Sequence, residues 1–273
     1  MSNAVFIEVD PGVKLFVQDW GSGRPILFIH GWPLSHEIFE YQMVPLMRAG
    51  NRVIGIDLRG FGQSDKPWQG NDYDTWADDV GKVIEALDLN GVLLAGFSMG
   101  GAIAMHYIAA QGDPRVTKLA LMGAAGPSFA KRPDNPSGIP LEEIEGLIKV
   151  ATTDRSKLAH DLGIVNFHTP ASPEFYRWLE DIRRKASPHA TICGLEELRD
   201  RDLRSELANI HIPTRIFHGV HDQVVPFALA EEQHSLIKGS IIVPFYNSGH
   251  GLFYDEKDRL NEELEQFSKS DQK

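Results

Sequence analysis

The clearest chemical motif in the sequence is a G-x-S-x-G pattern, Gly96-Phe97-Ser98-Met99-Gly100. It lies between a predicted strand, 92–95, and a predicted helix, 98–110, which is the setting of a nucleophile elbow. Such a turn would hold Ser98 in a strained conformation, with Gly96 and Gly100 preventing collisions across it. Free N–H groups at the start of a helix favour developing negative charge. The motif predicts a nucleophilic serine; the alternative is a Ser N-cap in a glycine-rich turn.

A serine hydroxyl is a weak nucleophile and needs a general base that a third group orients. In folds with this elbow the chain order is Ser, then Asp or Glu, then His. Asp222 follows a predicted strand, 214–218, and His250 follows the next one, 241–245. The carboxyl ends of parallel strands meet at one edge of a sheet, so both side chains would reach Ser98. We expect His250 to take the serine proton and Asp222 to fix the tautomer of the imidazole.

Other titratable residues compete for these roles. Asp57 is the rival acid, but it precedes Ser98 in the chain, so we expect it to hold a loop. The chain has 11 histidines, and away from position 250 we expect ordinary surface or core roles. His218, His221 and Asp222 are close in sequence, but no other cluster supplies further ligands, so no metal is predicted.

The developing oxyanion needs two backbone N–H donors. We expect one from Met99, the residue after the nucleophile, and one from the loop 30–33. Trp32 is the expected donor in that loop because Pro33 has no N–H, while Gly31 lets the backbone approach. Core packing is the alternative role for Trp32.

Strand and helix patterns alternate along the first 126 residues and return after residue 210. We predict strands at 5–9, 13–17, 25–29, 52–56, 92–95, 116–122, 214–218 and 241–245. This rhythm is typical of an α/β fold with a mostly parallel, doubly wound sheet of about eight strands and helices on both faces.

The rhythm breaks after residue 126. Residues 127–140 hold four prolines, and residues 141–207 carry helical patterns without a convincing strand. We therefore predict a core made of 1–126 and 211–273, with a helical cap, 127–210, over the carboxyl ends of the strands. Several side chains are candidates for a substrate pocket under that cap, although aromatic residues at helical spacing more often belong to the core. They are Phe129, Phe167, Tyr176, Trp178 and Val225.

Composition excludes several classes of function. Lys and Arg total 27 and Asp and Glu total 38, a net charge of −11, which disfavours binding to nucleic acid or to an anionic membrane. Gly60-Phe61-Gly62 lacks the third glycine of a dinucleotide motif, so no cofactor is predicted. The single cysteine, Cys193, and an N-terminus unlike a signal peptide favour a cytoplasmic protein.

On these residues the sequence resembles an α/β-hydrolase, and in particular the arylesterase and cofactor-free haloperoxidase (perhydrolase) group. The matching runs include HGWPLS at 30–35, RGFGQS at 59–64, GFSMGG at 96–101 and HGLF at 250–253. The resemblance implies that Ser98, Asp222 and His250 form a catalytic triad. It also implies that Trp32 and Met99 supply the oxyanion donors.

Members of this group hydrolyse short-chain esters, often aryl esters, and many make peracids from carboxylic acids and peroxide. The resemblance therefore implies a small-molecule ester substrate, no cofactor and a homo-oligomer. Pro33 resembles members with notable perhydrolysis. Gly249 stands where the group usually has proline before the histidine, which predicts a looser His250 loop. Residues 127–207 match weakly, so the resemblance does not identify the substrate.

Three functions are compatible with this sequence. The leading one is a serine esterase that works through an acyl-enzyme. The second is a C–C bond hydrolase, lactonase or γ-lactamase on the same triad. The third is a ligand receptor or regulator with little or no turnover. A dehalogenase or epoxide hydrolase would need Asp at position 98, where this chain has Ser98.

Overall fold

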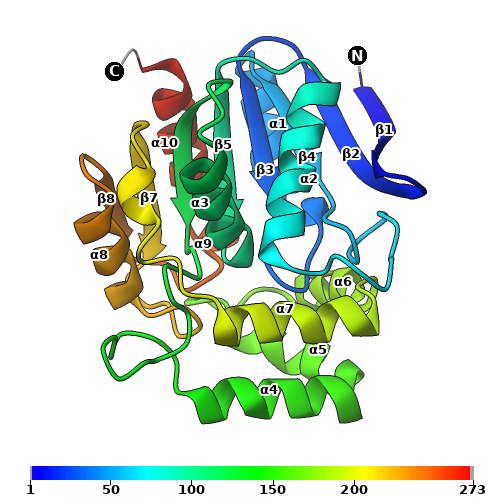
Figure 1. Cartoon of the computed structure of the whole chain (residues 1–273), viewed down its shortest axis with the longest axis vertical. Coiled ribbons are helices and arrows are strands. Elements are labelled where there is room, and N and C mark those ends of the chain that lie inside the picture. Colours follow the sequence, from blue (N-terminus) through cyan, green and yellow to red (C-terminus); the bar gives the residue numbers. More distant parts are fainter. Residues whose placement is uncertain (1, 271–273) are drawn as a thin grey trace.

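Eight strands form one sheet in the computed structural model, which describes residues 2–270 (Figure 1). The strands are β1 (Ser2–Asp10), β2 (Val13–Gly21), β3 (Pro25–Ile29), β4 (Arg52–Ile56), β5 (Val92–Phe97), β6 (Val116–Met122), β7 (Thr214–Gly219) and β8 (Ile241–Phe245). Their spatial order is β1-β2-β4-β3-β5-β6-β7-β8. Strands β3 to β8 are parallel, and the β1–β2 hairpin is antiparallel. The predicted mostly parallel α/β sheet is confirmed.

Helices cover both faces of the sheet, which is why the central strands are apolar at every position. One face carries α2 (Tyr73–Ala86), α3 (Met99–Gln111) and α8 (Phe227–Leu236). The other carries η1 (His36–Phe39), α1 (Glu40–Arg48), α9 (Leu252–Asp255) and α10 (Lys257–Lys269). Alternate residues of β3 divide between the two faces, since Leu27 and Ile29 join one buried cluster and Ile26 and Phe28 the other. Within residues 2–270 no helix is both long and apolar enough to span a bilayer.

Four further helices lie across the carboxyl ends of the parallel strands, at the bottom of Figure 1. We call them the cap: α4 (Leu141–Thr153), α5 (Arg155–Val165), α6 (Pro173–Arg184) and α7 (Pro188–Asp200). Both α6 and α7 begin with proline after a capping serine; Ser172 accepts from the N–H of Phe175, and Ser187 from that of Ala190. A short η2 (Leu207–Asn209) leads back to β7.

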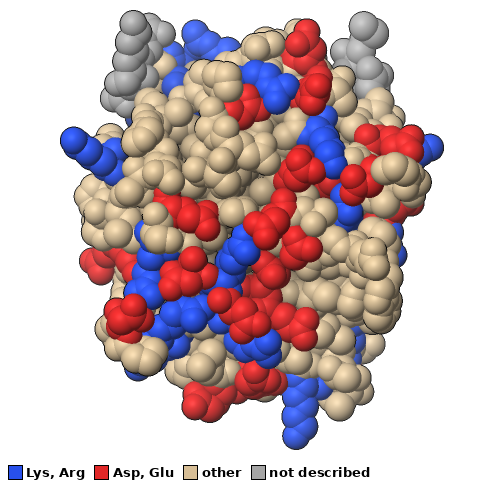
Figure 2. Space-filling model, viewed as in Figure 1, with Lys and Arg blue, Asp and Glu red and all other residues tan. Residues whose placement is uncertain are grey.

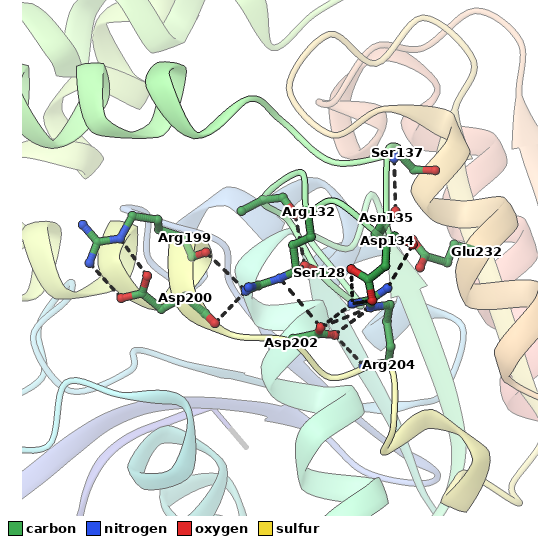
Figure 3. A network of polar contacts seen from close by, with 11 residues as sticks. Ser128, Arg132, Asp134, Asn135, Ser137, Arg199, Asp200, Asp202, Arg204 and Glu232 are labelled. Carbon is green, nitrogen blue, oxygen red and sulfur yellow. Dashed lines mark hydrogen bonds and ion pairs between the residues drawn. The ribbon is translucent and has the colours of Figure 1, made fainter.

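A polar network joins the segment that enters the cap to the segment that leaves it (Figure 3). Arg204 Nη2 lies 3.0 Å from Asp134 Oδ2 and 2.6 Å from Asp202 Oδ2. Arg132 donates to Ser128 Oγ at 2.9 Å and to the main-chain oxygen of Asp200 at 2.7 Å. Figure 2 shows acidic and basic side chains interleaved over the lower part of this face. The ends of the cap are thus attached to each other largely through charged side chains near the surface.

Candidate active site

Ser98 occupies the turn between β5 and α3, with φ 53° and ψ −121°. A positive φ is uncommon for a residue other than glycine and marks a strained backbone. A side chain at Gly96 would collide with the main chain of Gly100, and one at Gly100 with the main-chain oxygens of Ile29 and His30. A Cβ on Gly31 would lie 2.8 Å from Ser98 Cβ, so the loop after β3 passes directly beside the serine. The backbone has the strained geometry that the motif predicted.

The Asp222 carboxylate is buried at the end of β7 and binds the His250 imidazole. His250 Nδ1 lies 2.8 Å from Asp222 Oδ2, and Asp222 Oδ1 accepts the N–H groups of Val224 and Val225 at 2.8 Å each. Burial alone would raise the pKa of Asp222, but His250 and His218 hold it well below its ordinary value. Asp222 is therefore an ionised acceptor that orients His250 with Nδ1 as the donor.

His218 is a second imidazole on Asp222, to which the sequence alone assigned no site role. Its Nε2 lies 3.3 Å from Asp222 Oδ2 and 2.9 Å from the main-chain oxygen of Val225. A carbonyl oxygen only accepts, so Nε2 carries the proton. The four-residue spacing from Asp222 was visible in the sequence, but only the loop geometry brings the two side chains together.

The loop that carries His250 is held by two acidic residues at the end of α9. Gly249 N–H donates to Asp255 Oδ2 at 2.9 Å. Ser248 Oγ donates to Glu256 Oε2 at 2.7 Å. Proline at position 249 would have no N–H for Asp255. The glycine that the family resemblance associated with a looser loop therefore makes a hydrogen bond that proline could not make.

The main-chain N–H groups of Trp32 and Met99 have no hydrogen-bond acceptor among the described residues. Met99 is the first residue of α3, and Trp32 belongs to the loop that Gly31 brings against Ser98. The Trp32 indole is fixed separately, since its Nε1 donates to the main-chain oxygen of Thr191 in α7 at 2.8 Å. Two main-chain donors without an acceptor thus belong to the residue that follows the serine and to the loop that passes beside it.

Ser98 and His250 line one cavity of about 60 Å³ between the core and the cap. The core contributes Trp32, Leu34, Phe97, Ala125 and Val224, the segment that leads from β6 to the cap contributes Phe129, and the cap contributes Leu147, Leu162, Asn166, Arg183, Leu195 and Leu198. Most of these side chains are apolar, as expected for a pocket that binds a small organic substrate.

Of the predicted pocket residues, Phe129 lines this cavity and the others lie elsewhere. Trp178 borders a separate hollow with Trp20 and Lys185. Val225 is buried beside Asp222, and its neighbour Val224 faces the cavity. Tyr176 accepts the N–H of Ala171 through its hydroxyl. Tyr176 and Trp178 lie on α6, and the sequence pattern did not reveal which side of that helix faces the cavity.

Phe167 is the remaining predicted pocket residue, and it packs against the His250 loop instead. Its ring fills the space that a side chain on Gly251 would need. Gly251 N–H donates to the main-chain oxygen of Asn166 at 2.6 Å. The connection between α5 and α6 therefore rests directly on the residue after His250.

The rival acid, Asp57, holds local structure as expected. Asp57 Oδ1 accepts the Nδ1 of His36 at 2.7 Å, and Oδ2 accepts the N–H of Gln63 at 2.8 Å. Burial would raise the pKa of Asp57, but its bonds to His36 and Gln63 and the nearby His30 lower it. Both carboxylate oxygens of Asp57 are thus used to hold the loop after β4 and its neighbour His36.

A family model described as "alpha/beta hydrolase fold" matches residues 24–257. The chain belongs to this family. It is 51% identical over 265 residues to the AB hydrolase superfamily protein YisY of Bacillus subtilis, covering 97% of this chain and 99% of that protein. It is 34% identical to a non-heme haloperoxidase of Rhodococcus erythropolis, covering 97% and 99% of the two chains.

Solved structures place this α/β-hydrolase in the same group. An esterase from Exiguobacterium antarcticum superposes with a TM-score of 0.96 at 42% identity, covering 98% of this chain and 100% of that one. The resemblance to the esterase and haloperoxidase group, inferred from the sequence motifs, is confirmed.

Proposed function

We propose that this protein is a serine esterase that cleaves short-chain carboxylic esters through an acyl-enzyme. The observation that carries the proposal is that a serine in a strained elbow and a histidine bound to a buried carboxylate line one apolar cavity. The names of related proteins, an esterase and a non-heme haloperoxidase, support the same class of reaction.

The first half-reaction transfers the acyl group to the enzyme. Ser98 Oγ attacks the ester carbonyl carbon while His250 Nε2 accepts the hydroxyl proton. The N–H groups of Trp32 and Met99 hold the oxyanion. When the tetrahedral intermediate collapses, the C–O bond to the alcohol breaks and His250 returns the proton to the leaving oxygen. Asp222 stabilises the imidazolium throughout.

The second half-reaction releases the acid. Water attacks the acyl carbon and His250 accepts its proton; the bond from the acyl carbon to Ser98 Oγ then breaks, and His250 passes the proton to Oγ to restore the hydroxyl. Hydrogen peroxide in place of water would give a peracid by the same steps. Peroxide, like water, would attack the acyl carbon and lose a proton to His250, so that reaction would need neither metal nor haem.

Hydrolysis of p-nitrophenyl acetate by wild type and Ser98→Ala tests the proposal. We expect the variant to fall to background, a loss of about 10³-fold or more. Circular dichroism checks that it is folded, and Ser235→Ala on α8 serves as a matched control that retains activity. Equal turnover by wild type and Ser98→Ala would show that Ser98 is not the nucleophile.

Trapping of the intermediate tests the acyl-enzyme directly. Mass spectrometry after rapid quenching should find one acyl group on the peptide that contains Ser98. A modified peptide elsewhere, or turnover without any covalent species when deacylation is limiting, would contradict this mechanism.

A further inference from the structure

Arg183 is a buried cation in the wall of the cavity that holds Ser98 and His250. It lies on α6, is 2% exposed and is the one permanently charged side chain among the described residues that line the cavity. The rest of that lining is mostly apolar. A charge in such a wall raises the question of what balances it, because burying an ion without a partner is unfavourable.

The described residues give this guanidinium only weak hydrogen bonds and no ion pair. Its Nη1 and Nη2 lie 3.4 Å from the main-chain oxygens of Ala159 and Leu162, at the long end of hydrogen-bond distances. A guanidinium has five N–H donors. In the described part of the chain, no carboxylate lies within ion-pair distance of Arg183. Burial lowers the pKa of Arg183 to about 10 although the Glu180 carboxylate raises it, and the guanidinium is still protonated at neutral pH.

Two other arginines, Arg59 and Arg184, show how arginine charges are balanced elsewhere in this chain. Arg59 is buried to a similar degree, and it binds Asp79 through two bonds and Asp10 through a third, all at 2.6 Å. Arg184, the next residue after Arg183, is partly exposed and pairs with Glu180 and Asp181. Arg183 differs from both, since it is buried, borders a cavity and has no directly bound carboxylate among the described residues.

We propose that Arg183 binds a carboxylate on the substrate, so that the preferred ester carries an acid group remote from the bond that is cleaved. This inference rests on the proposed esterase function. A planar guanidinium matches a carboxylate through two parallel N–H bonds. Asn166, which lines the same cavity, makes no side-chain hydrogen bond to other described residues and adds a neutral amide donor.

Matched pairs of esters test this assignment. One pair is mono-p-nitrophenyl glutarate and its methyl ester, with the charge on the acyl side. The other is 4-acetoxybenzoate and its methyl ester, with the charge on the alcohol side. For each protein the readout is the kcat/KM ratio of charged to neutral ester, which is independent of the fraction of folded enzyme. The pair that gives the higher ratio shows which end of the substrate faces Arg183.

We expect the wild type to prefer the charged member of one pair and Arg183→Met to lower that ratio by roughly 10- to 100-fold, the usual range for bonds to a charged group. Arg183→Lys keeps the charge but loses the two parallel N–H donors of the guanidinium, so its ratio should lie between those of the wild type and Arg183→Met. Arg184→Met is the control on the same helix and should leave the ratio unchanged. Free glutarate should inhibit the wild type competitively and inhibit Arg183→Met much more weakly.

The outcomes separate the two proposals. If the wild type cleaves neither member of either pair, the esterase proposal fails. If it cleaves both members but shows no preference for charge, or if Arg183→Met lowers both rates alike, Arg183 only connects α6 to α5 and this inference is overturned. If Arg183→Met does not fold, the wild-type ratio, the glutarate inhibition and Arg183→Lys decide the question.

Discussion

The core and the cap both line the cavity, but they hold their residues in different ways. In the core, position is set by the main chain: Ser98 stands on a turn without room for extra atoms, and Asp222 accepts two main-chain N–H groups. In the cap, the cavity wall is made of side chains, and the ends are joined by charged groups such as Arg204 and Asp134. Core positions should therefore tolerate little change, whereas cap positions can vary with the substrate.

The largest effect should come from Asp222, the core residue that orients the proposed base, His250. Asp222→Asn places a neutral amide beside His250, which favours the wrong tautomer and removes the charge that stabilises the imidazolium. We expect kcat/KM for p-nitrophenyl acetate to fall by about 10⁴-fold with little change in the circular dichroism spectrum. A loss below about tenfold would mean that the carboxylate is dispensable.

The same substitution should change the acid stability of the protein. The pKa of Asp222 is lower in the folded chain than its unfolded value of about 3.9, so its stabilising contribution is complete above that pH and is lost as the pH falls below it. In urea titrations between pH 5 and pH 2, Asp222→Asn should show a shallower decline than the wild type. Equal slopes would contradict the assigned charge.

Replacing one glycine of the core and one glycine of the cap by alanine should change the free energy of unfolding in opposite directions. We expect the size of these changes to be intermediate among those predicted here. Gly100→Ala would press a methyl group onto main-chain oxygens, and we expect it to lower the free energy of unfolding by about 3 kcal/mol. Gly146→Ala, on the exposed side of α4 with open space around it, should raise it by about 0.5–1 kcal/mol. Urea denaturation measures both, and similar values for the two variants would refute the contrast.

The smallest effect should come from the network at the ends of the cap. Arg204→Gln removes contacts to Asp134 and Asp202, which are partly exposed, and we expect a loss of at most about 1 kcal/mol that shrinks in high salt. Urea denaturation at low and high salt measures this change. Arg177→Gln, which removes an exposed pair within α6, is the control. A loss as large as that of Gly100→Ala would show that the cap attachments are as critical as the elbow.

The contrast between the regions also explains what could be predicted from the sequence. The strands were predictable because buried parallel strands are short continuous apolar runs, and Ser98, Asp222 and His250 were candidates because each follows one of them. Cap residues were not predictable in this way. Arg183 and Arg184 are neighbours of the same type, and a rotation of about 100° per residue around α6 determines which one turns inward. Only the packing of α6 on α5 reveals that orientation.

The contact of Phe167 with Gly251 limits how such proteins can be recombined. A chimaera that exchanges only the segment between the two ends of the cap would bring a foreign side chain to the place where Phe167 meets Gly251. The hydrogen bond from Gly251 N–H to the main-chain oxygen of Asn166 would then form only if the foreign loop had the same backbone geometry. A chimaera that keeps its activity would therefore need the cap and the loop around His250 from the same parent protein. These two stretches are distant in sequence but must change together.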